Sequence, residues 1–291
     1  MDMVQPTTWA EALAEKAAST DLLPIAGGTD VMVDLNFDRR RPAGLLDLTR
    51  VAQLREWSVA DGTVELGAGV TYAQVIADLA DLLPGLAMAS RTVGSPQIRN
   101  RGTVGGNLGS ASPAGDAHPP LLAAQAVVEL GSVRGVRHVP IGDFFLGVKR
   151  SVLEPDELIR AVHVPVARGP EQFSKIGTRN AMVIAVTSFG LRLDPARRSV
   201  GTGLGSAAPT PRAAMEAEHF LAGGLEEAGA WDAPRALPES LVGRFAELVA
   251  GAAEPIDDVR GSAAYRRHAL AVMARRTLTW AWDEYRQGVP A

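Results

Sequence analysis

Short apolar runs and amphipathic segments alternate at the start of the chain. Residues 8–11, Thr-Trp-Ala-Glu, form a capping-box pattern that predicts a helix ending near Ser19. The apolar run 22–26 leads into a glycine pair, and the segment 30–37 that follows has a helical pattern. This order predicts a strand, a glycine turn and a second helix.

A hairpin and a further helix are predicted next. The apolar segments 57–59 and 63–66 flank Asp61-Gly62, a pair that adopts positive φ easily and is typical of tight hairpins. Thr71-Tyr-Ala-Gln74 repeats the capping-box pattern, and the helix it starts is expected to stop at Pro84-Gly85. Further strands are expected at 126–130, 135–141 and 158–164.

A change in composition predicts a domain boundary near Ala167-Arg-Gly-Pro170, where linker residues gather. We therefore divide the chain into domains 1–166 and 167–291. In the second domain, Asp194-Pro195 is expected to turn a pair of strands at 182–193 and 199–205. A largely helical tail from about Arg212 is interrupted by the Gly- and Pro-rich segment 223–238. The strands and helices do not alternate regularly, which indicates an α+β fold rather than a doubly wound sheet.

Composition excludes several classes of function. The 291 residues carry a net charge of −4 and only short basic clusters, so nucleic acid is not expected as a partner. The chain has no cysteine, which removes disulfides, thiol nucleophiles and the ligation of iron–sulfur clusters by this chain. Metal redox chemistry, if this protein takes part in it, therefore belongs to another chain.

The location of the protein follows from two missing patterns. No apolar run reaches the ~20 residues that span a bilayer. The first residues, Met-Asp-Met-Val-Gln-Pro, lack the basic and apolar regions of a signal peptide. We expect a cytoplasmic protein without a membrane span.

Two glycine-rich segments are candidate anion sites. Ile25-Ala-Gly-Gly-Thr-Asp30 fits a strand, turn and helix start, and Thr103-Val-Gly-Gly-Asn107 forms a second such turn. Glycine lets the backbone approach a ligand closely, and successive N–H groups in a turn form a concave anion site. Each segment alone fits an ordinary tight turn. Together they suit a diphosphate bound from two sides, with the N–H groups of Gly105 and Gly106 facing it.

Other familiar motifs give weak or negative signals. There is no P-loop and no G-x-S-x-G nucleophile elbow. Gly203-Leu-Gly205 and Gly67-Ala-Gly69 resemble parts of a dinucleotide fingerprint, but neither continues into the required helix pattern. The five histidines are scattered without the spacing of metal ligands. We expect each to be a surface or turn residue, and we predict no metal site.

Two charged positions have two open interpretations each. Asp116 follows the second glycine segment, where it either caps the helix that starts at His118 or accepts hydrogen bonds from ribityl or ribose hydroxyls. Lys175 and Arg179 are expected to be exposed at the start of the second domain. They lie either on a solvated strand edge or across a domain cleft from a cofactor, since such clefts favour ligands.

Taken together, these segments resemble a known family. Ala26-Gly-Gly-Thr-Asp30, Thr103-Val-Gly-Gly-Asn107, Ala111-Ser-Pro-Ala-Gly-Asp116 and Phe173-Ser-Lys-Ile-Gly-Thr-Arg179 occur in the order seen in FAD-binding medium subunits of molybdenum hydroxylases. Gly261-Ser-Ala-Ala-Tyr-Arg-Arg-His268 is similar to the closing helix motif of that family. The resemblance implies a vanillyl-alcohol-oxidase (PCMH)-type FAD-binding domain of two subdomains. A C-terminal domain with a small antiparallel sheet and helices follows it.

The resemblance also implies which residues hold FAD between the two domains. Residues 24–31 and 103–107 would wrap the pyrophosphate, Asp116 would hold hydroxyls of the cofactor, and Ile159 and Lys175 would border it. Val93 falls where relatives often carry an aromatic residue, and we include it. The implied cofactor-binding residues are Pro24, Ile25, Ala26, Gly27, Gly28, Thr29, Asp30, Val31, Val93, Thr103, Val104, Gly105, Gly106, Asn107, Asp116, Ile159 and Lys175.

Partners follow from the same resemblance. Relatives work with a small subunit that carries [2Fe–2S] clusters and a large subunit that carries the molybdopterin cofactor. Electrons would reach FAD in this chain and pass to NAD⁺, a quinone or oxygen, in a dimer of heterotrimers. The cofactor supplies the chemistry, so no catalytic residue is expected in this chain.

The motifs leave the substrate and the class of function open. Ser95-Pro-Gln-Ile-Arg-Asn-Arg-Gly102 and Gly147-Val-Lys-Arg150 look most similar to bacterial xanthine dehydrogenase subunits, which favours xanthine or hypoxanthine. A subunit acting with carbon monoxide, an aromatic compound or an aldehyde is the alternative within the family. Two other classes remain, a stand-alone FAD oxidase and a flavin-free binding protein with the same fold.

Overall fold

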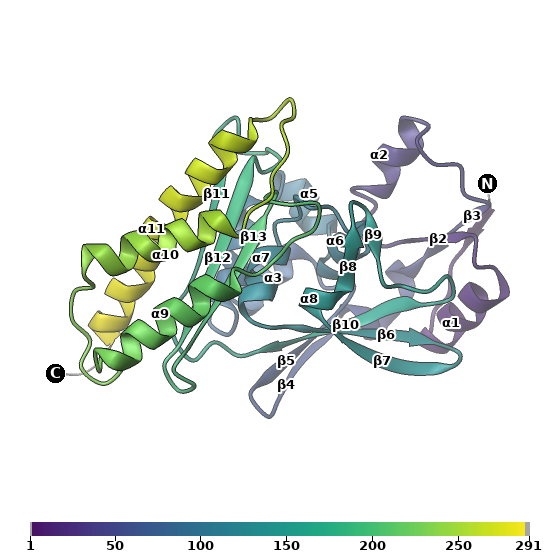
Figure 1. Ribbon diagram of the computed structural model, residues 1–291. Coiled ribbons are helices and arrows are strands. Elements are labelled where there is room, and N and C mark those ends of the chain that lie inside the picture. The colour runs from purple at the N-terminus through teal and green to yellow at the C-terminus, as the bar shows by residue number, and fades with distance from the viewer. Residues whose placement is uncertain (1, 289–291) are drawn as a thin grey trace.

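The computed structural model describes residues 2–288 and contains two units of mixed helix and sheet, which confirms the predicted α+β class (Figure 1). The first unit contains most of the strands and short helices, and the second contains a small sheet and three longer helices. Within the described residues, no helix combines the length and the apolar character needed to cross a membrane.

The N-terminal unit contains two larger sheets and the small two-stranded sheet β8-β9. The parallel sheet has the strand order β1-β3-β2, and the five-stranded antiparallel sheet has the order β4-β5-β10-β6-β7. One apolar core joins them. The elements are β1 (Asp2–Val4), α1 (Trp9–Ala18), β2 (Leu22–Ile25), α2 (Val31–Asn36), β3 (Gly44–Asp47), the 3-10 helices η1 (Leu48–Arg50) and η2 (Ala52–Arg55), β4 (Trp57–Ala60), β5 (Thr63–Gly67), α3 (Tyr72–Asp78), α4 (Pro84–Thr92), α5 (Pro96–Arg101), α6 (Val104–Ser110), α7 (His118–Ala123), β6 (Val127–Ser132), β7 (Gly135–Pro140), α8 (Ile141–Phe144), β8 (Phe145–Gly147), β9 (Arg150–Ser151) and β10 (Leu158–Pro165).

Local sequence signals account for several of these elements. Both predicted capping boxes form, at Thr8 and at Thr71, where each hydroxyl accepts the N–H of the third helical residue. The hairpin between β4 and β5 also forms, with positive φ at Asp61 and Gly62. One boundary was wrong: α3 ends at Asp78, and the Pro84 predicted to end it begins α4. Proline suits that position because the first N–H of a helix has no partner to lose.

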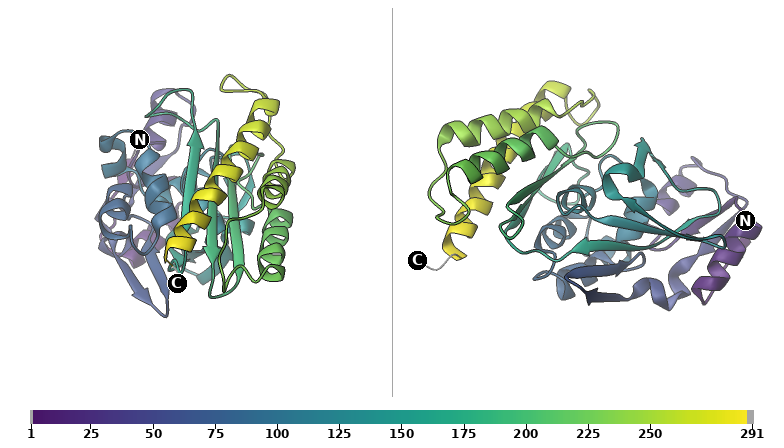
Figure 2. Two further views of the ribbon diagram at one scale, coloured as in Figure 1. Left: turned by 90° about the vertical axis from the view of Figure 1, so that its left-hand side faces the viewer. Right: turned by 60° about the horizontal axis from the view of Figure 1, so that its bottom comes forward.

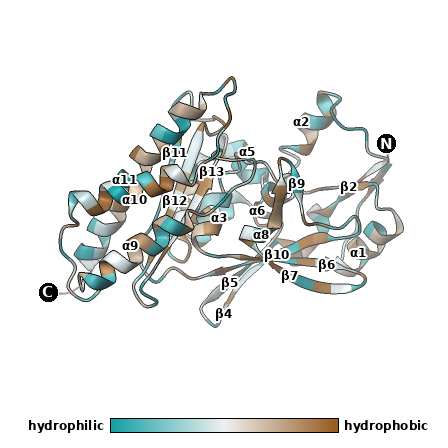
Figure 3. Cartoon of the chain, viewed as in Figure 1, coloured by the Kyte–Doolittle hydropathy of each residue, from teal (hydrophilic) through white to brown (hydrophobic). Residues whose placement is uncertain are grey.

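The C-terminal unit packs three helices on an antiparallel sheet with the order β11-β12-β13. The long helix α11 lies along this sheet (Figure 2, left), and hydrophobic and hydrophilic positions alternate along α10 and α11 (Figure 3). The aromatic residues Trp231, Phe245 and Trp282 are buried in the core between helices and sheet. The elements are β11 (Glu171–Ile176), β12 (Thr187–Asp194), β13 (Ser199–Gly205), α9 (Met215–Glu227), α10 (Glu239–Gly251) and α11 (Ala263–Gly288).

The predicted helical tail and strand pair differ from the structure in their boundaries. α9 continues through Gly223-Gly224, where a break was expected, and ends only at Glu227. The helical tail is also interrupted at residues 252–262, between α10 and α11, and this interruption was not predicted. β12 begins at Thr187, so residues 182–186 lie in the preceding loop. These short glycine and apolar patterns did not define where an element starts, because packing on the sheet decides it.

The small sheet is shared by both units. Its far face is covered by α4 and α7 of the N-terminal unit. Strand residues alternate between faces, and β12 and β13 place glycine on the α7 side. A Cβ on Gly203 would lie 2.1 Å from the Pro119 carbonyl oxygen, and one on Gly201 would lie 2.0 Å from that of Ala123. Gly201 and Gly203, the second of which belonged to a fingerprint-like pattern, therefore let the α7 backbone lie directly on the sheet.

Buried polar contacts also join the units. The Glu171 carboxylate accepts the Gly85 N–H at 3.0 Å. The Arg192 guanidinium donates to the carbonyl oxygens of Pro165 and Val166, both at 2.9 Å. Arg192 of the second unit thus fixes the start of the segment that connects β10 to β11. The division at residues 166 and 167 stays our interpretation of this arrangement.

Candidate functional site

The two glycine-rich segments lie against each other. A Cβ on Gly27 would lie 1.9 Å from the Arg101 carbonyl oxygen, so the first segment can only follow this path with glycine there. The Ser110 hydroxyl, at the end of α6, donates to the Asp30 carboxylate at 2.7 Å. Segments separated by about seventy residues in the sequence therefore form one continuous surface, as the two-sided prediction required.

The first segment presents a run of free backbone donors. Gly28 has a positive φ of 75°, which turns the chain between β2 and α2. Among the described residues, no acceptor pairs with the N–H groups from Gly27 to Val31, and the first N–H in α2 with a backbone partner is that of Met32. A concave run of free N–H groups is a site for an anion such as a phosphate.

The second segment acts differently from the prediction. The Gly105 N–H donates to the Ala68 carbonyl oxygen at 3.0 Å, and the Gly106 N–H donates to the Thr103 hydroxyl at 2.9 Å. The expectation that these two N–H groups face a diphosphate is wrong. A Cβ on Gly105 would lie 2.5 Å from that of Ala68, so this glycine seats α6 against the end of β5.

A buried ion pair lies at the contact between the units. The Lys175 ammonium on β11 donates to the Asp116 carboxylate at 2.5 Å and to the Thr92 carbonyl oxygen at 3.3 Å. Both side chains are less than a tenth exposed, so the expectation of an exposed Lys175 is wrong, whereas Arg179 is exposed. The Asp116 side chain does not cap α7, which removes that interpretation.

The burial of Asp116 shapes its chemistry. Burial raises the pKa of Asp116, and the ammonium of Lys175 opposes this rise without cancelling it. One carboxylate oxygen, Oδ1, has no hydrogen-bond partner among the described residues. A buried oxygen without a partner is costly, so Oδ1 is available to accept a hydrogen bond from a ligand hydroxyl.

Further buried polar atoms without partners surround the same region. They belong to side chains of α3, α6 and α7: the Tyr72 hydroxyl, Asn107 Oδ1 and His118 Nδ1. Burial, with the charges of Asp116 and Asp30, raises the pKa of Tyr72 well above its ordinary value, so this hydroxyl remains a donor. Tyr72 thus lies within range of both the ion pair and Asp30 of the first glycine segment. Native structures leave few such atoms unsatisfied, and their concentration here fits a polar ligand.

The other predicted residues take supporting positions. Pro24 and Ile25 end β2, and Ala26 follows them. Ile159 lies on β10 beside α6, with its Cδ1 atom 3.8 Å from the position of a Cβ on Gly109. Val93 directly follows α4, and its carbonyl oxygen accepts a hydrogen bond from Arg99 Nη1 at 3.2 Å. The sequence interpretation missed Tyr72, Thr92 and His118, although Tyr72 lies within the second capping box.

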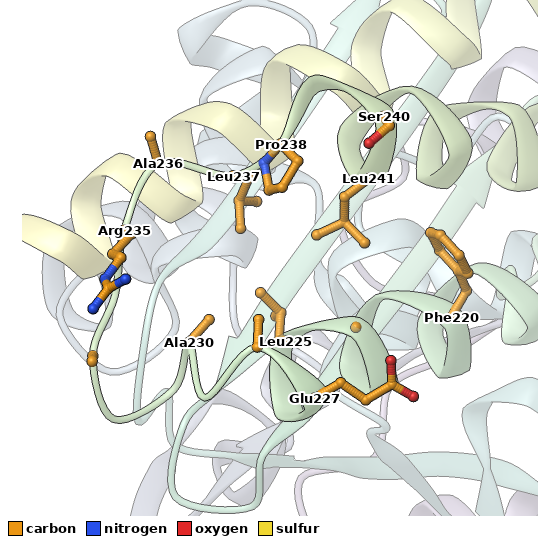
Figure 4. Close-up of a pocket in the computed structure, with 13 residues that line it drawn as sticks. Phe220, Leu225, Glu227, Ala230, Arg235, Ala236, Leu237, Pro238, Ser240 and Leu241 are labelled. Carbon is orange, nitrogen blue, oxygen red and sulfur yellow. The ribbon is translucent and has the colours of Figure 1, made fainter.

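A separate cavity lies in the C-terminal unit. It measures about 670 Å³ and is lined by residues of α9, α10 and the loop between them, including Phe220, Leu225, Arg235 and Leu241 (Figure 4). Its lining is mostly apolar, and no glycine segment or ion-pair residue reaches it. We therefore do not place the predicted cofactor there.

His118 makes the fold sensitive to acid. This residue is fully buried, so its assignment as a surface or turn histidine was wrong. Burial lowers the pKa of His118 to about 4, from an ordinary value of 6.5. The unfolded chain therefore takes up the proton first. Stability is fully present above pH 6.5 and is lost as the pH falls through 4, by up to about 3 kcal/mol.

The variant His118→Gln tests this, because glutamine can still donate to the Asn107 carbonyl oxygen but does not titrate. Urea unfolding at pH 7.5 and pH 4.5 should show a smaller acid-induced loss in His118→Gln than in the unsubstituted chain. The exposed His268, changed to glutamine, should keep the full loss. Equal losses in all three chains would rule out His118 as the cause.

Comparison with known proteins identifies the family. A family model described as the FAD binding domain in molybdopterin dehydrogenase matches residues 1–167. The chain belongs to this family. A second model, described as the CO dehydrogenase flavoprotein C-terminal domain, matches residues 172–281. The chain is thus an FAD subunit of the molybdenum hydroxylase family and an oxidoreductase subunit. The FAD assignment is confirmed.

One relative matches nearly the whole chain, and another matches about two thirds of it. The xanthine dehydrogenase FAD-binding subunit of Escherichia coli O157:H7 is 31% identical over 285 residues, covering 94% of this chain and 92% of that protein. The nicotinate dehydrogenase FAD-subunit of Eubacterium barkeri is 35% identical over 195 residues, covering 64% of this chain and 66% of that protein.

Solved structures confirm the predicted fold. A chain of quinoline 2-oxidoreductase from Pseudomonas putida 86 superposes with a TM-score of 0.88 at 26% identity, covering 98% of both chains. A chain of carbon monoxide dehydrogenase from Hydrogenophaga pseudoflava gives a TM-score of 0.87 at 27% identity, again covering 98% of both. The chain therefore shares the fold of these two proteins, whose names point to different substrates.

Proposed function

We propose that this chain holds FAD between the free N–H run of the first glycine segment and the buried polar cluster around Asp116. The single observation that carries the placement is the run of unpaired N–H groups from Gly27 to Val31, which suits a diphosphate. The unpaired Asp116 Oδ1 suits a hydroxyl of the cofactor. Together with Pro24, Ile25, Ala26, Val93, Thr103, Val104, Gly105, Gly106, Asn107, Ile159 and Lys175, these residues form the proposed binding set.

The second glycine segment supports this site indirectly. The hydrogen bond from the Gly105 N–H to the Ala68 carbonyl oxygen holds α6 against the end of β5. The carbonyl oxygen of Arg101 sets how closely Gly27 can approach this segment. Lys175 holds one oxygen of Asp116 and leaves the other free. Bound FAD accepts and passes on electrons singly or in pairs, which is the chemistry of the cofactor. The residues of this chain bind and orient it, and none is assigned as catalytic.

We further propose that the complete enzyme oxidises xanthine or hypoxanthine and that NAD⁺ receives the electrons. A small [2Fe–2S] subunit and a large molybdopterin subunit would complete it, in a cytoplasmic dimer of heterotrimers. The near-full-length similarity to a xanthine dehydrogenase FAD-binding subunit supports this substrate. The carbon monoxide dehydrogenase medium chain of Afipia carboxidovorans, 29% identical over 95% of both chains, supports carbon monoxide as the second candidate.

The test is to purify the chain with its bound partners and add candidate substrates without oxygen. Xanthine should bleach the flavin absorbance near 450 nm, and NAD⁺ should restore it. Bleaching by carbon monoxide, nicotinate or an aldehyde, but not by xanthine, would replace the substrate assignment. Substrate turnover by this chain alone would instead favour a stand-alone oxidase. Denaturation should release about one FAD per chain, and a preparation that neither contains nor binds FAD would overturn the site.

A further inference from the structure

The outer face of the antiparallel sheet carries a row of ionisable side chains far from the glycine segments in the sequence. Strand residues alternate, so Val128 and Leu130 of β6 face the core while Glu129 points to the other side. On that side Glu129 pairs directly with His138 of β7. His163 of β10 lies diagonally across from Glu129, two positions from its direct partner Ala161.

Three possible metal ligands converge there. The Glu129 Oε2 atom lies 2.7 Å from His163 Nε2 and 3.7 Å from His138 Nε2. One ligand atom from each residue can be chosen so that all lie within 4.8 Å of one another. In a tetrahedral zinc site with bonds of about 2.0–2.1 Å, ligand atoms are separated by roughly 3.3 Å. The two distances from Glu129 Oε2 lie on either side of that value, so a metal would require the two imidazole rings to shift by rotation of their side chains.

The charges around Glu129 suit a cation. Arg160 Nη1 donates to the other oxygen, Oε1, at 2.8 Å and to Glu65 at 3.0 Å. This contact orients the carboxylate in the manner of an outer-shell partner and leaves Oε2 toward the histidines. Burial raises the pKa of Glu129, but the hydrogen bond from His163 and the charge of Arg160 outweigh it, so the net pKa is lowered. With Glu65 opposing Arg160, the cluster keeps one net negative charge when its histidines are neutral.

We propose that Glu129, His138 and His163 form a site for Zn²⁺ or a similar divalent transition metal, separate from the FAD site. Two imidazoles and one carboxylate favour such metals over Mg²⁺ and Ca²⁺, which prefer oxygen ligands. His138 is 55% exposed, so a fourth coordination position faces solvent. The bound metal would replace the proton shared by Glu129 and His163 and link β6, β7 and β10.

The decisive measurement is equilibrium dialysis with radioactive zinc. The protein is purified with its bound partners and without a histidine tag, because such a tag would itself bind zinc. The radioactive label ensures that only added zinc is counted. The unsubstituted protein should bind one zinc per chain more than His138→Ala or His163→Ala. Each substitution should weaken this binding at least tenfold. His219→Ala, at an exposed histidine on α9, is the matched control and should bind as the unsubstituted protein does.

His138 is largely exposed, so His138→Ala should fold normally, and its far-UV circular dichroism should match the unsubstituted protein. Zinc should also raise the melting temperature of the unsubstituted protein but not that of His138→Ala, whereas Mg²⁺ should raise neither. Equal zinc binding by the unsubstituted protein and both site variants overturns the proposal, as does an equal loss in His219→Ala. None of these readouts depends on FAD content or enzyme activity.

Discussion

The Gly27→Ala variant is expected to lose its FAD. The added Cβ would lie 1.9 Å from the Arg101 carbonyl oxygen, and this neighbour is backbone that cannot rotate away. The two segments must separate, which displaces the free N–H groups of residues 27–31. We expect FAD affinity to fall by a factor of about 100 or more, equal to ~3 kcal/mol. The ratio of flavin absorbance to protein absorbance after gel filtration, and titration with added FAD, measure the loss.

A glycine in open space provides the control for this substitution. Gly223 lies in α9, and a Cβ there would meet no atom within 4 Å. Gly223→Ala should keep full FAD content and gain up to about 1 kcal/mol of stability, because alanine favours the helix. Full flavin occupancy in Gly27→Ala would contradict the close approach of the two segments. The collision with the Arg101 backbone is by itself sufficient to cause the effect.

The Lys175→Met variant should be strongly destabilised at neutral pH. It leaves the Asp116 carboxylate buried without its counter-charge, and breaking such a pair costs about 3–5 kcal/mol. The double variant Lys175→Met with Asp116→Asn should recover part of that loss, because the uncompensated charge is gone. Urea unfolding with and without added FAD measures both effects, and FAD affinity should fall in the single variant.

An exposed lysine serves as the matched control. Lys149 is 57% exposed and pairs with Asp34, so Lys149→Met should cost no more than about 1 kcal/mol. In Lys175→Met the pKa of Asp116 should rise further, because the ammonium that opposes the burial effect is gone and only the weaker hydrogen bond from the Thr92 hydroxyl still lowers it. The folded pKa of Asp116 already exceeds the unfolded one and would exceed it by more in this variant, so the penalty is relieved at acidic pH and grows as the pH rises through the folded value. Equal free energies of unfolding for the two lysine variants would show that the buried pair contributes no more to stability than the exposed pair.

Sequence patterns predicted the local features of the site but not their partners. The glycine pair at 27 and 28 was recognised because a turn with positive φ depends only on adjacent residues. The role of Gly105 was misjudged, since its N–H bonds to Ala68, which lies on a different element. Asp116 had two equally supported interpretations until Lys175 of the second unit was placed beside it.

The same distinction applies to the histidines. His118 follows a turn in the sequence, yet α7 is buried between the two units and takes the side chain out of water. His138 and His163 share no ligand spacing with Glu129, so motif searching found nothing. Only the register of β6 against β7 and β10 brings the three side chains to one face.

By itself, the sequence determined the family, the cofactor class, both capping boxes and the glycine turn that offers free N–H groups. These features are encoded by residues within a few positions of each other, or by motifs kept in order along the chain. The tertiary structure alone decided what each glycine contacts, the pairing of Asp116 with Lys175, the burial of His118 and the cluster on the outer sheet. Those depend on strand register and on the packing of α7 against the second unit, which join residues far apart in the sequence and are set by the whole core.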